Sequence, residues 1–364
     1  MKVAALLIFL LCAASFGLDA EQVIYVPEDY SQIQKAIDAA PEGAVIRVAP
    51  GHYRENIDFK GKNIRLTSET YEDWDEVKKT IIDGGGEGPA VIMNGDRCFL
   101  IGFTIKNGLG IMGEFEGREI KTGGGILVTA GTSPVIAQNN ILENTSHWGA
   151  GIMAREESSP YIGGNVISAN EGSFGGGIFL EKPGGAWVEE NTISGNIASE
   201  EGGGDGGAIY VLGGEATVYG NNLSGNLARK NGGGIAIYRE ASIRLEKNTL
   251  SGNTASNLGG GIFSDTPGAD IKENIFNGNI AGKGGAIYLE QPPQNSIYGN
   301  ELNSNRAISE GGGLYSVVGE GLLFQNNQFI ANLATRGGAF FIEDEGNWEK
   351  EGNSFLGNAP GDEE

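Results

Sequence analysis

One short phrase recurs through most of this chain and constrains its fold more than any other feature. The pattern Asn-x-(Ile/Leu/Phe)-x-x-Asn occurs nine times, at steps of 26, 26, 30, 27, 26, 26, 27 and 26 residues, with both asparagines in every copy. The first asparagines are Asn139, Asn165, Asn191, Asn221, Asn248, Asn274, Asn300, Asn327 and Asn353. Recurrence at such a period indicates a repeat architecture in which each unit stacks on the next.

Two apolar positions keep step with the asparagines. One follows a Gly or Ala and comprises Ile126, Ile152, Ile178, Ile209, Ile235, Ile262, Ile287, Leu314 and Phe340. The other precedes the first asparagine by three residues and comprises Ile136, Ile162, Val188, Val218, Leu245, Ile271, Ile297 and Phe324, with Lys350 in the last copy. Each copy thus holds short apolar segments between Gly- or Asn-marked corners, and none has the length or period of a helix.

This period predicts an all-β fold, a right-handed parallel β-helix of about a dozen coils with three strands in each coil. Successive coils of such a fold stack about 4.8 Å apart. We expect the isoleucines to face inward and to stack on their own copies in the next coil. We expect the asparagines at the corners, where they tolerate the left-handed conformation and their amides can hydrogen-bond along the axis.

The two ends of the stack differ from its middle. Ser31-Gln32-Ile33-Gln34 resembles a capping box, and the segment up to Ala40 predicts a short helix over the first coil. We therefore divide residues 21–364 into the cap and irregular coils (21–120), nine regular repeats (121–358) and an acidic tail (359–364). Lys350 and the surrounding acidic residues predict a charged closing end.

The first 20 residues predict a signal peptide. Met1 and Lys2 precede the apolar run Val3 to Leu11, and small residues follow it. The run is shorter than the roughly 20 residues that a membrane-spanning helix needs, and no later segment is apolar enough to span. We expect a protein that is secreted or held at the cell surface, and a monomer.

Charge and cysteine content exclude several classes of protein, namely nucleic-acid-binding, disulfide-rich and zinc-binding proteins. The chain has 25 Lys and Arg against 47 Asp and Glu, a net charge of −22, and lacks the clustered basic residues that nucleic acids need. Its two cysteines cannot form a disulfide framework, and no Cys/His cluster resembles a zinc site. After removal of the leader, Cys98 is the sole thiol, and we interpret it as a small core residue.

Two segments carry a resemblance to known families. The opening from Tyr30 to Pro41, followed by Ala49-Pro50-Gly51-His52-Tyr53-Arg54-Glu55-Asn56, is similar to the start of pectin methylesterases. The chain thus resembles the pectin-lyase-like superfamily, and repeats such as Gly284-Gly285-Ala286-Ile287 resemble those of polymorphic outer-membrane proteins. The resemblance implies the β-helix fold. It leaves lyase, hydrolase, esterase, epimerase and non-catalytic surface protein open.

Strand alternation predicts which side chains face water. The third residue after each recurring isoleucine is charged in five of nine copies, so this row and the row directly after the isoleucines should face outward. These rows place Phe179, Tyr210, Tyr238, Phe263, Tyr288, Tyr315 and Phe341 on one face. Exposed rings of this kind suit the apolar faces of sugars. Alternatively, the rings stabilise one another between coils, or a loop covers them.

One mixed-charge region is the candidate for chemistry. It combines Arg155 with Glu181 and Lys182, has His147 in the preceding corner, and lies beside an enlarged corner that contains Asp205. In a catalytic interpretation, Arg155 or Lys182 neutralises a uronate, and Glu181 or Asp205 holds a cation or acts as base. The alternative is a solvated cluster of surface charges.

Two glycine-rich segments superficially resemble ion-binding loops. Asp83-Gly84-Gly85-Gly86 lacks the following helix of a phosphate loop, and Gly202-Gly203-Gly204-Asp205 does not repeat as calcium rolls do. We therefore expect no defined metal site and no cofactor, although the acidic surface allows loose binding of Ca²⁺. We expect a non-catalytic extracellular binder of polysaccharide or of a cell-envelope partner. The alternative is a polysaccharide lyase or related carbohydrate-active enzyme that acts on acidic glycans.

Overall fold

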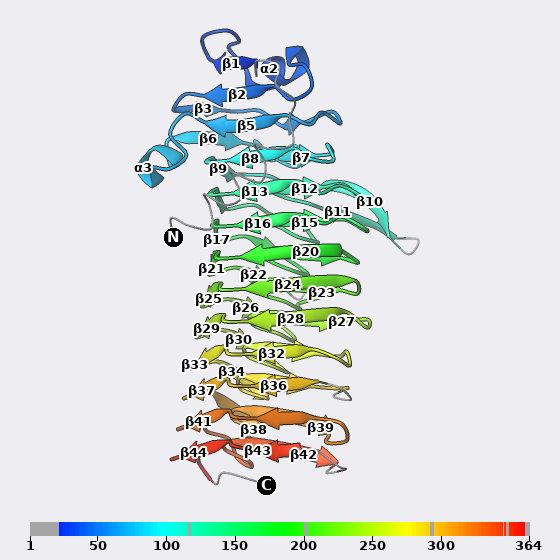
Figure 1. Ribbon diagram of the computed structural model, residues 1–364, viewed down its shortest axis with the longest axis vertical. Coiled ribbons are helices and arrows are strands. Elements are labelled where there is room, and N and C mark those ends of the chain that lie inside the picture. The colour runs from blue at the N-terminus through cyan, green and yellow to red at the C-terminus, as the bar shows by residue number, and fades with distance from the viewer. Residues whose placement is uncertain are drawn as a thin grey trace.

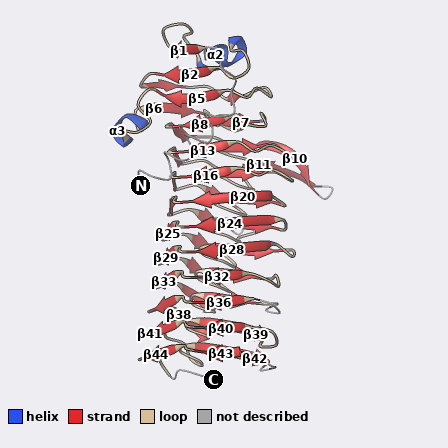
Figure 2. Ribbon diagram, in the orientation of Figure 1, coloured by secondary structure: helices blue, strands red, loops and turns tan. Residues whose placement is uncertain are grey.

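A computed structural model shows a long stack of coils with a small helical cap at its N-terminal end (Figure 1). The structure describes residues 22–115, 118–199, 203–291, 295–344, 346 and 349–360. The predicted signal peptide, residues 1–20, lies outside this part, as do residues 361–364 of the acidic tail. Nearly all of the regular structure is strand (Figure 2).

Three long parallel sheets form the walls of the stack. Sheet A has 13 strands: β1 (Val23–Val26), β2 (Val45–Val48), β5 (Arg65–Ser68), β8 (Phe99–Ile101), β13 (Val135–Ala137), β16 (Tyr161–Gly163), β20 (Gly184–Glu189), β24 (Glu215–Tyr219), β28 (Ser242–Glu246), β32 (Asp270–Lys272), β36 (Ser296–Tyr298), β40 (Leu323–Gln325) and β43 (Glu349–Glu351). Sheet B has 12 strands: β3 (Gly51–Tyr53), β6 (Thr80–Asp83), β9 (Thr104–Lys106), β14 (Asn140–Leu142), β17 (Val166–Ser168), β21 (Thr192–Ser194), β25 (Asn222–Ser224), β29 (Thr249–Ser251), β33 (Ile275–Asn277), β37 (Glu301–Asn303), β41 (Gln328–Ile330) and β44 (Ser354–Leu356). Sheet C has 11 strands: β4 (Ile57–Asp58), β7 (Val91–Met93), β12 (Ile126–Val128), β15 (Ile152–Ala154), β19 (Ile178–Glu181), β23 (Ile209–Leu212), β27 (Ile235–Tyr238), β31 (Ile262–Ser264), β35 (Ile287–Leu289), β39 (Leu314–Val318) and β42 (Phe340–Asp344).

A fourth, shorter sheet was not expected. This corner sheet has six strands: β18 (Glu171–Gly172), β22 (Ile197–Ala198), β26 (Leu227–Ala228), β30 (Thr254–Ala255), β34 (Ile280–Lys283) and β38 (Arg306–Glu310). It follows sheet B in six consecutive coils, and its buried alanines, Ala198, Ala228, Ala255 and Ala281, form a small cluster of their own. A separate antiparallel hairpin, β10 (Ile111–Phe115) and β11 (Arg118–Thr122), projects from the side of the stack (Figure 1).

The recurring apolar residues pair with their own copies, as predicted. Ile152 lies opposite Ile178 in sheet C, and Ile136 lies opposite Ile162 in sheet A. These residues belong to one continuous buried core that runs along the axis. Burial of Cys98 in this core raises the pKa of its thiol to about 12, so the thiol stays protonated.

Both asparagines of the repeat form ladders along the axis. In the first ladder each side-chain amide donates to the side-chain oxygen of the next copy at 2.9–3.1 Å. In the second ladder the same bond measures 2.9–3.0 Å. The stacked amides are therefore confirmed. The expected left-handed asparagines are wrong, because positive φ falls on the residue before each one, as at Gln138, Glu143 and Ala169.

A short helix closes the first coil, but without the expected capping box. Helix α2 (Ile33–Ala39) begins after Gln32, whose side chain makes no capping hydrogen bond. Instead, the carboxylate of Glu55 accepts the backbone N–H groups of Ile33 and Gln34, each at 3.0 Å. The carboxylate of Glu55, which is distant in the sequence, thus satisfies N-terminal N–H groups that a local capping side chain would otherwise satisfy. A second short helix, α3 (Trp74–Val77), lies on the side of the stack.

Charged side chains mark the other end. Strand β43 is exposed along its length, in contrast to the half-buried sheet A strands that precede it. The ammonium of Lys350 lies 5.2 Å from the ring centres of both Phe340 and Phe355, over the end of the core. The rings remove part of the water around this ammonium, and the desolvation lowers the pKa of Lys350. The charged closing end is therefore present.

Candidate functional site

The aromatic row of sheet C points away from the central core, as strand alternation predicts, but it is not exposed to water. Phe179, Tyr210, Phe263, Tyr288 and Tyr315 are only 0–6% exposed, and Tyr238 and Phe341 are half-buried. The expectation that this row of rings is exposed to water is therefore wrong. The rings stack on one another instead, for example Phe179 on Tyr210 at 4.8 Å and Tyr288 on Tyr315 at 4.9 Å between ring centres.

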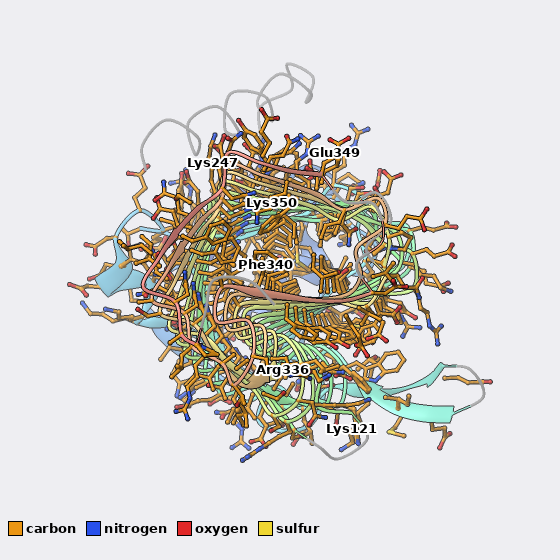
Figure 3. All side chains as sticks on the ribbon, turned by 90° about the horizontal axis from the view of Figure 1, so that it is seen from below. Lys121, Lys247, Arg336, Phe340, Glu349 and Lys350 are labelled. Atoms are coloured by element: carbon orange, nitrogen blue, oxygen red, sulfur yellow. The ribbon has the colours of Figure 1, made fainter. Side chains whose placement is uncertain are left out.

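The chain itself covers these rings. Viewed along the axis, side chains fill a second space between the strand that carries Phe340 and the bend at Arg336 (Figure 3). Trp148, from the segment before β15, stacks on Phe179 at 5.0 Å, and Phe174 meets Tyr210 edge-on. A left-handed glycine lets this segment fold back over the sheet. At Gly175 a Cβ atom would lie 2.4 Å from the carbonyl oxygen of Ile178.

The predicted catalytic residues form pairs rather than one cluster. Arg155 Nε lies 2.9 Å from Glu181 Oε2, and the Glu181 side chain is only 1% exposed. Burial raises the pKa of Glu181, and the nearby Arg155 opposes this rise. Lys182 pairs with Glu156 at 2.6 Å on the surface. Arg155 is thus engaged by a buried carboxylate, and Lys182 by an exposed one.

Asp205 and His147 lie apart from these pairs. The Asp205 carboxylate is buried, accepts the backbone N–H of Asn231 at 3.0 Å, and lies 3.9 Å from Lys230 Nζ. His147 is exposed at its corner, where its backbone oxygen accepts the N–H groups of Ser173 and Phe174. The neighbouring residues Glu200, Glu201 and Gly202 lie outside the described part of the chain.

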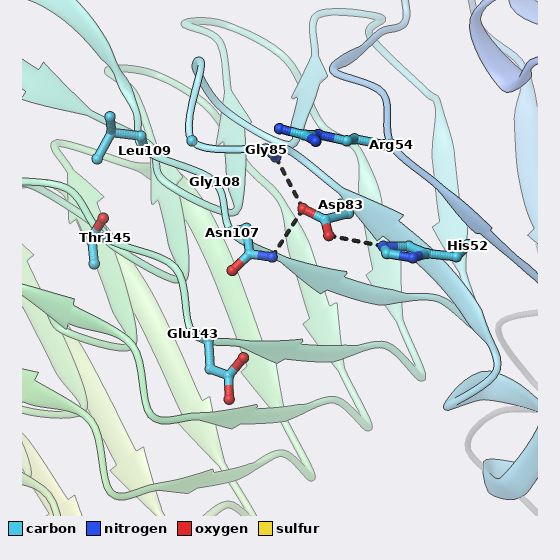
Figure 4. Close-up of a pocket in the computed structure, with 10 residues that line it drawn as sticks. His52, Arg54, Asp83, Gly85, Asn107, Gly108, Leu109, Glu143 and Thr145 are labelled. Carbon is cyan, nitrogen blue, oxygen red and sulfur yellow. Dashed lines mark hydrogen bonds and ion pairs between the residues drawn. The ribbon is translucent and has the colours of Figure 1, made fainter.

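A groove of about 510 Å³ lies nearer the N-terminal end, along the edge of sheet B. It is lined by His52, Arg54, Asp83, Gly85, Gly86, Asn107, Gly108, Leu109, Glu143 and Thr145 (Figure 4). These residues lie at the ends of β3, β6, β9 and β14 and in the turns that follow these strands. The turns of consecutive coils stack on one another along one side of the molecule. The groove therefore spans several coils.

Asp83 organises the polar side of this groove (Figure 4). Its carboxylate lies 2.8 Å from His52 Nε2, and it accepts the Asn107 side-chain amide at 2.9 Å and the Gly85 N–H at 3.0 Å. Although burial raises the pKa of Asp83, the hydrogen bonds from Asn107, His52 and Gly85 outweigh it and hold the pKa below its ordinary value. Asp83 therefore stays ionised and orients the imidazole.

Arg54 supplies a cation at the rim of the groove. Its side chain passes so close to Gly85 that a Cβ atom there would lie 3.0 Å from Arg54 Nε. No ion pair joins Arg54 to a carboxylate within the described residues. The imidazole of His52 is 56% exposed beside it. The groove thus presents one unpaired guanidinium and one oriented imidazole to solvent.

Sequence reasoning did not identify this groove as a site. The sequence points to His52 and Arg54 only through the family resemblance, and to Asp83 only through its glycine-rich neighbourhood. The coils that carry them lack the asparagine phrase, so their register could not be counted. His52 pairs across the sheet with Ile81, and Asp83 with Lys106. Only the folded chain brings His52 and Asp83 together, and no local signal predicts it.

Two further findings bear on the site. No group of three or more His, Cys, Asp or Glu side chains that could hold a metal ion exists among the residues that the structure describes. In the same part of the chain, no helix has both the length and the apolar character needed to cross a membrane.

Comparison with known proteins gives a family. Two segments of the chain, residues 71–223 and 207–362, match the profile of a family described as "Right handed beta helix region". Searches of curated proteins and of solved structures gave no match. The two segments together span well over half of the sequence, and the family's fold agrees with the parallel sheets described above. The chain therefore belongs to the right-handed β-helix family.

Proposed function

We propose that this protein is an exported, extracellular β-helix that binds an acidic polysaccharide in the groove between His52 and Glu143. The observation that carries this proposal is the unpaired guanidinium of Arg54, which projects beside the oriented imidazole of His52. An arginine fork matches the geometry of a sugar carboxylate or sulfate. The leader-like residues 1–20 support export.

The rest of the groove suits sugar hydroxyls. Asn107, Glu143 and Thr145 place amide, carboxylate and hydroxyl groups along its length, next to the apolar side chain of Leu109. Such a mixture of convergent polar groups and apolar surface is typical of ligand sites. The floor is held in place by the Gly108 N–H, which donates to the side-chain oxygen of Asn144 at 2.9 Å. A rigid floor reduces the entropy lost on binding.

The test compares acidic and neutral polysaccharides. We expect polygalacturonate or alginate oligomers to bind in calorimetry, and Arg54→Ala to weaken that binding by about tenfold, the cost of one charged hydrogen-bonded pair. The matched control is Arg97→Ala, an exposed arginine that lies 3.8 Å from Asp96 and outside the groove. Binding should also weaken with added salt, because the contact is exposed.

Two results would refute this proposal. One is the absence of binding to every acidic polysaccharide tested. The other is equal affinity of Arg54→Ala and the unsubstituted protein for an acidic polysaccharide that does bind.

One observation favours a second function, eliminative cleavage of the acidic glycan. Asp83 engages Nε2 of His52, which leaves Nδ1 of the exposed ring available to accept a proton. In this reaction Nδ1 takes the proton from the carbon next to the uronate carboxylate, while Arg54 neutralises that carboxylate. A double bond forms between that carbon and the adjacent ring carbon, whose bond to the glycosidic oxygen breaks. Water supplies the proton to that oxygen, and the resulting hydroxide takes the proton held by Nδ1, which restores His52. Ultraviolet absorbance of unsaturated uronate, present in the unsubstituted protein and lost in His52→Ala, distinguishes this function from binding alone.

A further inference from the structure

A second open surface lies on the outer face of sheet A, away from the groove. Tyr161 of β16 and Trp187 of β20 stand opposite each other on consecutive coils. Trp187 is 42% exposed, Tyr161 is half-buried, and the rings of sheet C, by contrast, are covered. These two side chains, together with Glu189, are called the sheet A platform below.

The tyrosine ring of the platform lies flat along the sheet rather than standing upright. A Cβ atom on Gly163 would lie 2.3–2.5 Å from three atoms of the Tyr161 side chain, so the tyrosine ring covers that glycine. Gly163 is paired across the sheet with Glu189, which places the tyrosine hydroxyl beside that carboxylate. The Tyr161 ring can lie flat against the sheet because Gly163 has no side chain.

One carboxylate fixes both rings. Glu189 Oε2 accepts the Tyr161 hydroxyl at 3.1 Å and the Trp187 indole N–H at 3.2 Å. An ionised carboxylate has about four acceptor positions, so the second oxygen of Glu189 remains able to accept hydrogen bonds. The platform therefore joins two oriented aromatic faces to a hydrogen-bond acceptor at their edge.

The chemistry of the platform selects its ligand. A pyranose ring has an apolar face of C–H groups and a rim of hydroxyl donors, which match an aromatic face and a carboxylate. The cross-strand neighbours that flank the rings are Val135 and Thr217, both uncharged. The carboxylate of Glu189 repels the carboxylate of a uronate, and it equally repels the phosphates of a nucleic acid, whose bases would otherwise stack on such rings.

We propose that the sheet A platform binds neutral pyranose residues of a polysaccharide. This site is independent of the groove and does not rest on the acidic ligand proposed there. Together the two surfaces fit a heteropolysaccharide that carries both neutral and acidic sugars.

The experiment titrates the full protein with cellohexaose, mannohexaose and chitohexaose, all neutral, by calorimetry. We expect at least one of these oligosaccharides to bind. Trp187→Ala should weaken that binding by about tenfold or more, which is typical when a protein loses one aromatic ring that stacks on its ligand. Glu189→Gln should weaken binding too, because it loses the charged acceptor. Tyr161→Phe keeps the ring but loses its bond to Glu189, and a smaller loss of affinity is expected.

The matched control is Tyr298→Ala, which removes a 40% exposed tyrosine from the same face of sheet A several coils away. The Tyr298→Ala variant should bind the neutral oligosaccharide with the affinity of the unsubstituted protein. Melting temperatures should show that all variants are folded. Arg54→Ala should retain neutral-sugar binding, so failure of the groove proposal and failure of this one are distinguishable.

Three outcomes overturn the proposal. The first is that no neutral oligosaccharide binds at millimolar concentration. The second is that a neutral oligosaccharide binds but Trp187→Ala and Glu189→Gln retain full affinity. The third is that the unsubstituted protein dimerises in sedimentation and Trp187→Ala dissociates it, which would make the platform an interface between copies of this chain.

Discussion

Each asparagine inside the two ladders satisfies buried groups of the coil before it and of the coil after it. Asn226 donates its amide to Ile193 O and to Asn253 Oδ1, both at 2.9 Å. Its own Oδ1 accepts the backbone N–H and the side-chain amide of Asn196, both at 3.0 Å. Buried polar groups without partners are costly, so the ladder leaves little choice of residue type at this position.

We therefore predict that Asn226→Ala destabilises the protein by about 2–4 kcal/mol, because it leaves several buried donors and acceptors unpaired. The measurement is the free energy of unfolding from urea denaturation. Asn222→Ala is the control, since Asn222 lies on the same strand, β25, but is exposed, and its replacement should cost less than about 0.5 kcal/mol. Equal costs for the two variants would contradict the role assigned to the ladder.

A buried carboxylate makes stability depend on pH. Burial raises the pKa of Asp205 above its ordinary value of 3.8, and Lys230, Tyr238 and Asn231 only partly oppose this rise. The folded chain then binds more protons than the unfolded chain once the pH exceeds the ordinary value. The unfolding free energy therefore falls as pH rises through the window between the ordinary and the raised pKa.

Asp205→Asn removes this titration and keeps the side-chain shape. We predict that the variant gains stability relative to the unsubstituted protein as the pH rises from about 4 to about 7. Urea unfolding of both proteins across this range measures the difference. A difference that stays constant, or that shrinks with rising pH, would show that Asp205 does not titrate in this way.

At the scale of structural elements, sheet C is covered on both faces. Its isoleucines face the central core, and its aromatic row is packed beneath the segments that contain Trp148, Phe174 and Leu258. A strand buried on both faces is typical of parallel sheets with covering elements. The aromatic row therefore belongs to the interior of the protein.

Phe179→Ala tests this second layer. The ring is 1% exposed and contacts Trp148 and Tyr210, so we predict a loss of about 3–5 kcal/mol, as for other buried phenylalanines. The exposed ring of Tyr298 on sheet A provides the comparison, and Tyr298→Ala should cost less than about 1 kcal/mol. Chemical denaturation measures the unfolding free energy of both variants. A small loss of stability for Phe179→Ala would mean that the aromatic row is open to solvent.

At the scale of the whole molecule, stability is a sum over neighbouring coils. Each coil contacts only the coil above and the coil below, so the two ends have fewer partners than the middle. Helix α2 covers the first coil with Ile33 and Ile37, both fully buried. At the other end, most side chains of β43 and β44 are exposed, and among the described residues Lys350 and the half-buried Phe355 lie over the core.

Hydrogen exchange should therefore be graded along the axis. We predict that backbone amides of β43 and β44 exchange fastest, those of β1 and β2 more slowly, and those of the central coils slowest. Mass spectrometry of peptides from each coil measures this order. Uniform protection from end to end would indicate that the stack opens only as a whole.

The sequence by itself determined the coil period, the inward isoleucine rows and the two asparagine ladders. Each of these depends on one residue meeting its own copy a fixed number of positions later. Strand alternation then predicts that the row containing Phe179 and Tyr288 points away from the central core, and the structure confirms that direction. Counting along the chain is sufficient for such features, because in-register stacking converts a sequence period directly into contact.

Tertiary structure alone decided which outward faces meet solvent and which segments from irregular coils become neighbours. The covering of Tyr288, the capping of α2 by Glu55 and the approach of His52 to Asp83 all depend on the path of corners whose lengths vary. Alternation gives the direction of a side chain but not what lies over it. For that reason sheet A carries exposed rings such as Trp187 and Tyr298, while most of the rings that the sequence singled out are buried on sheet C.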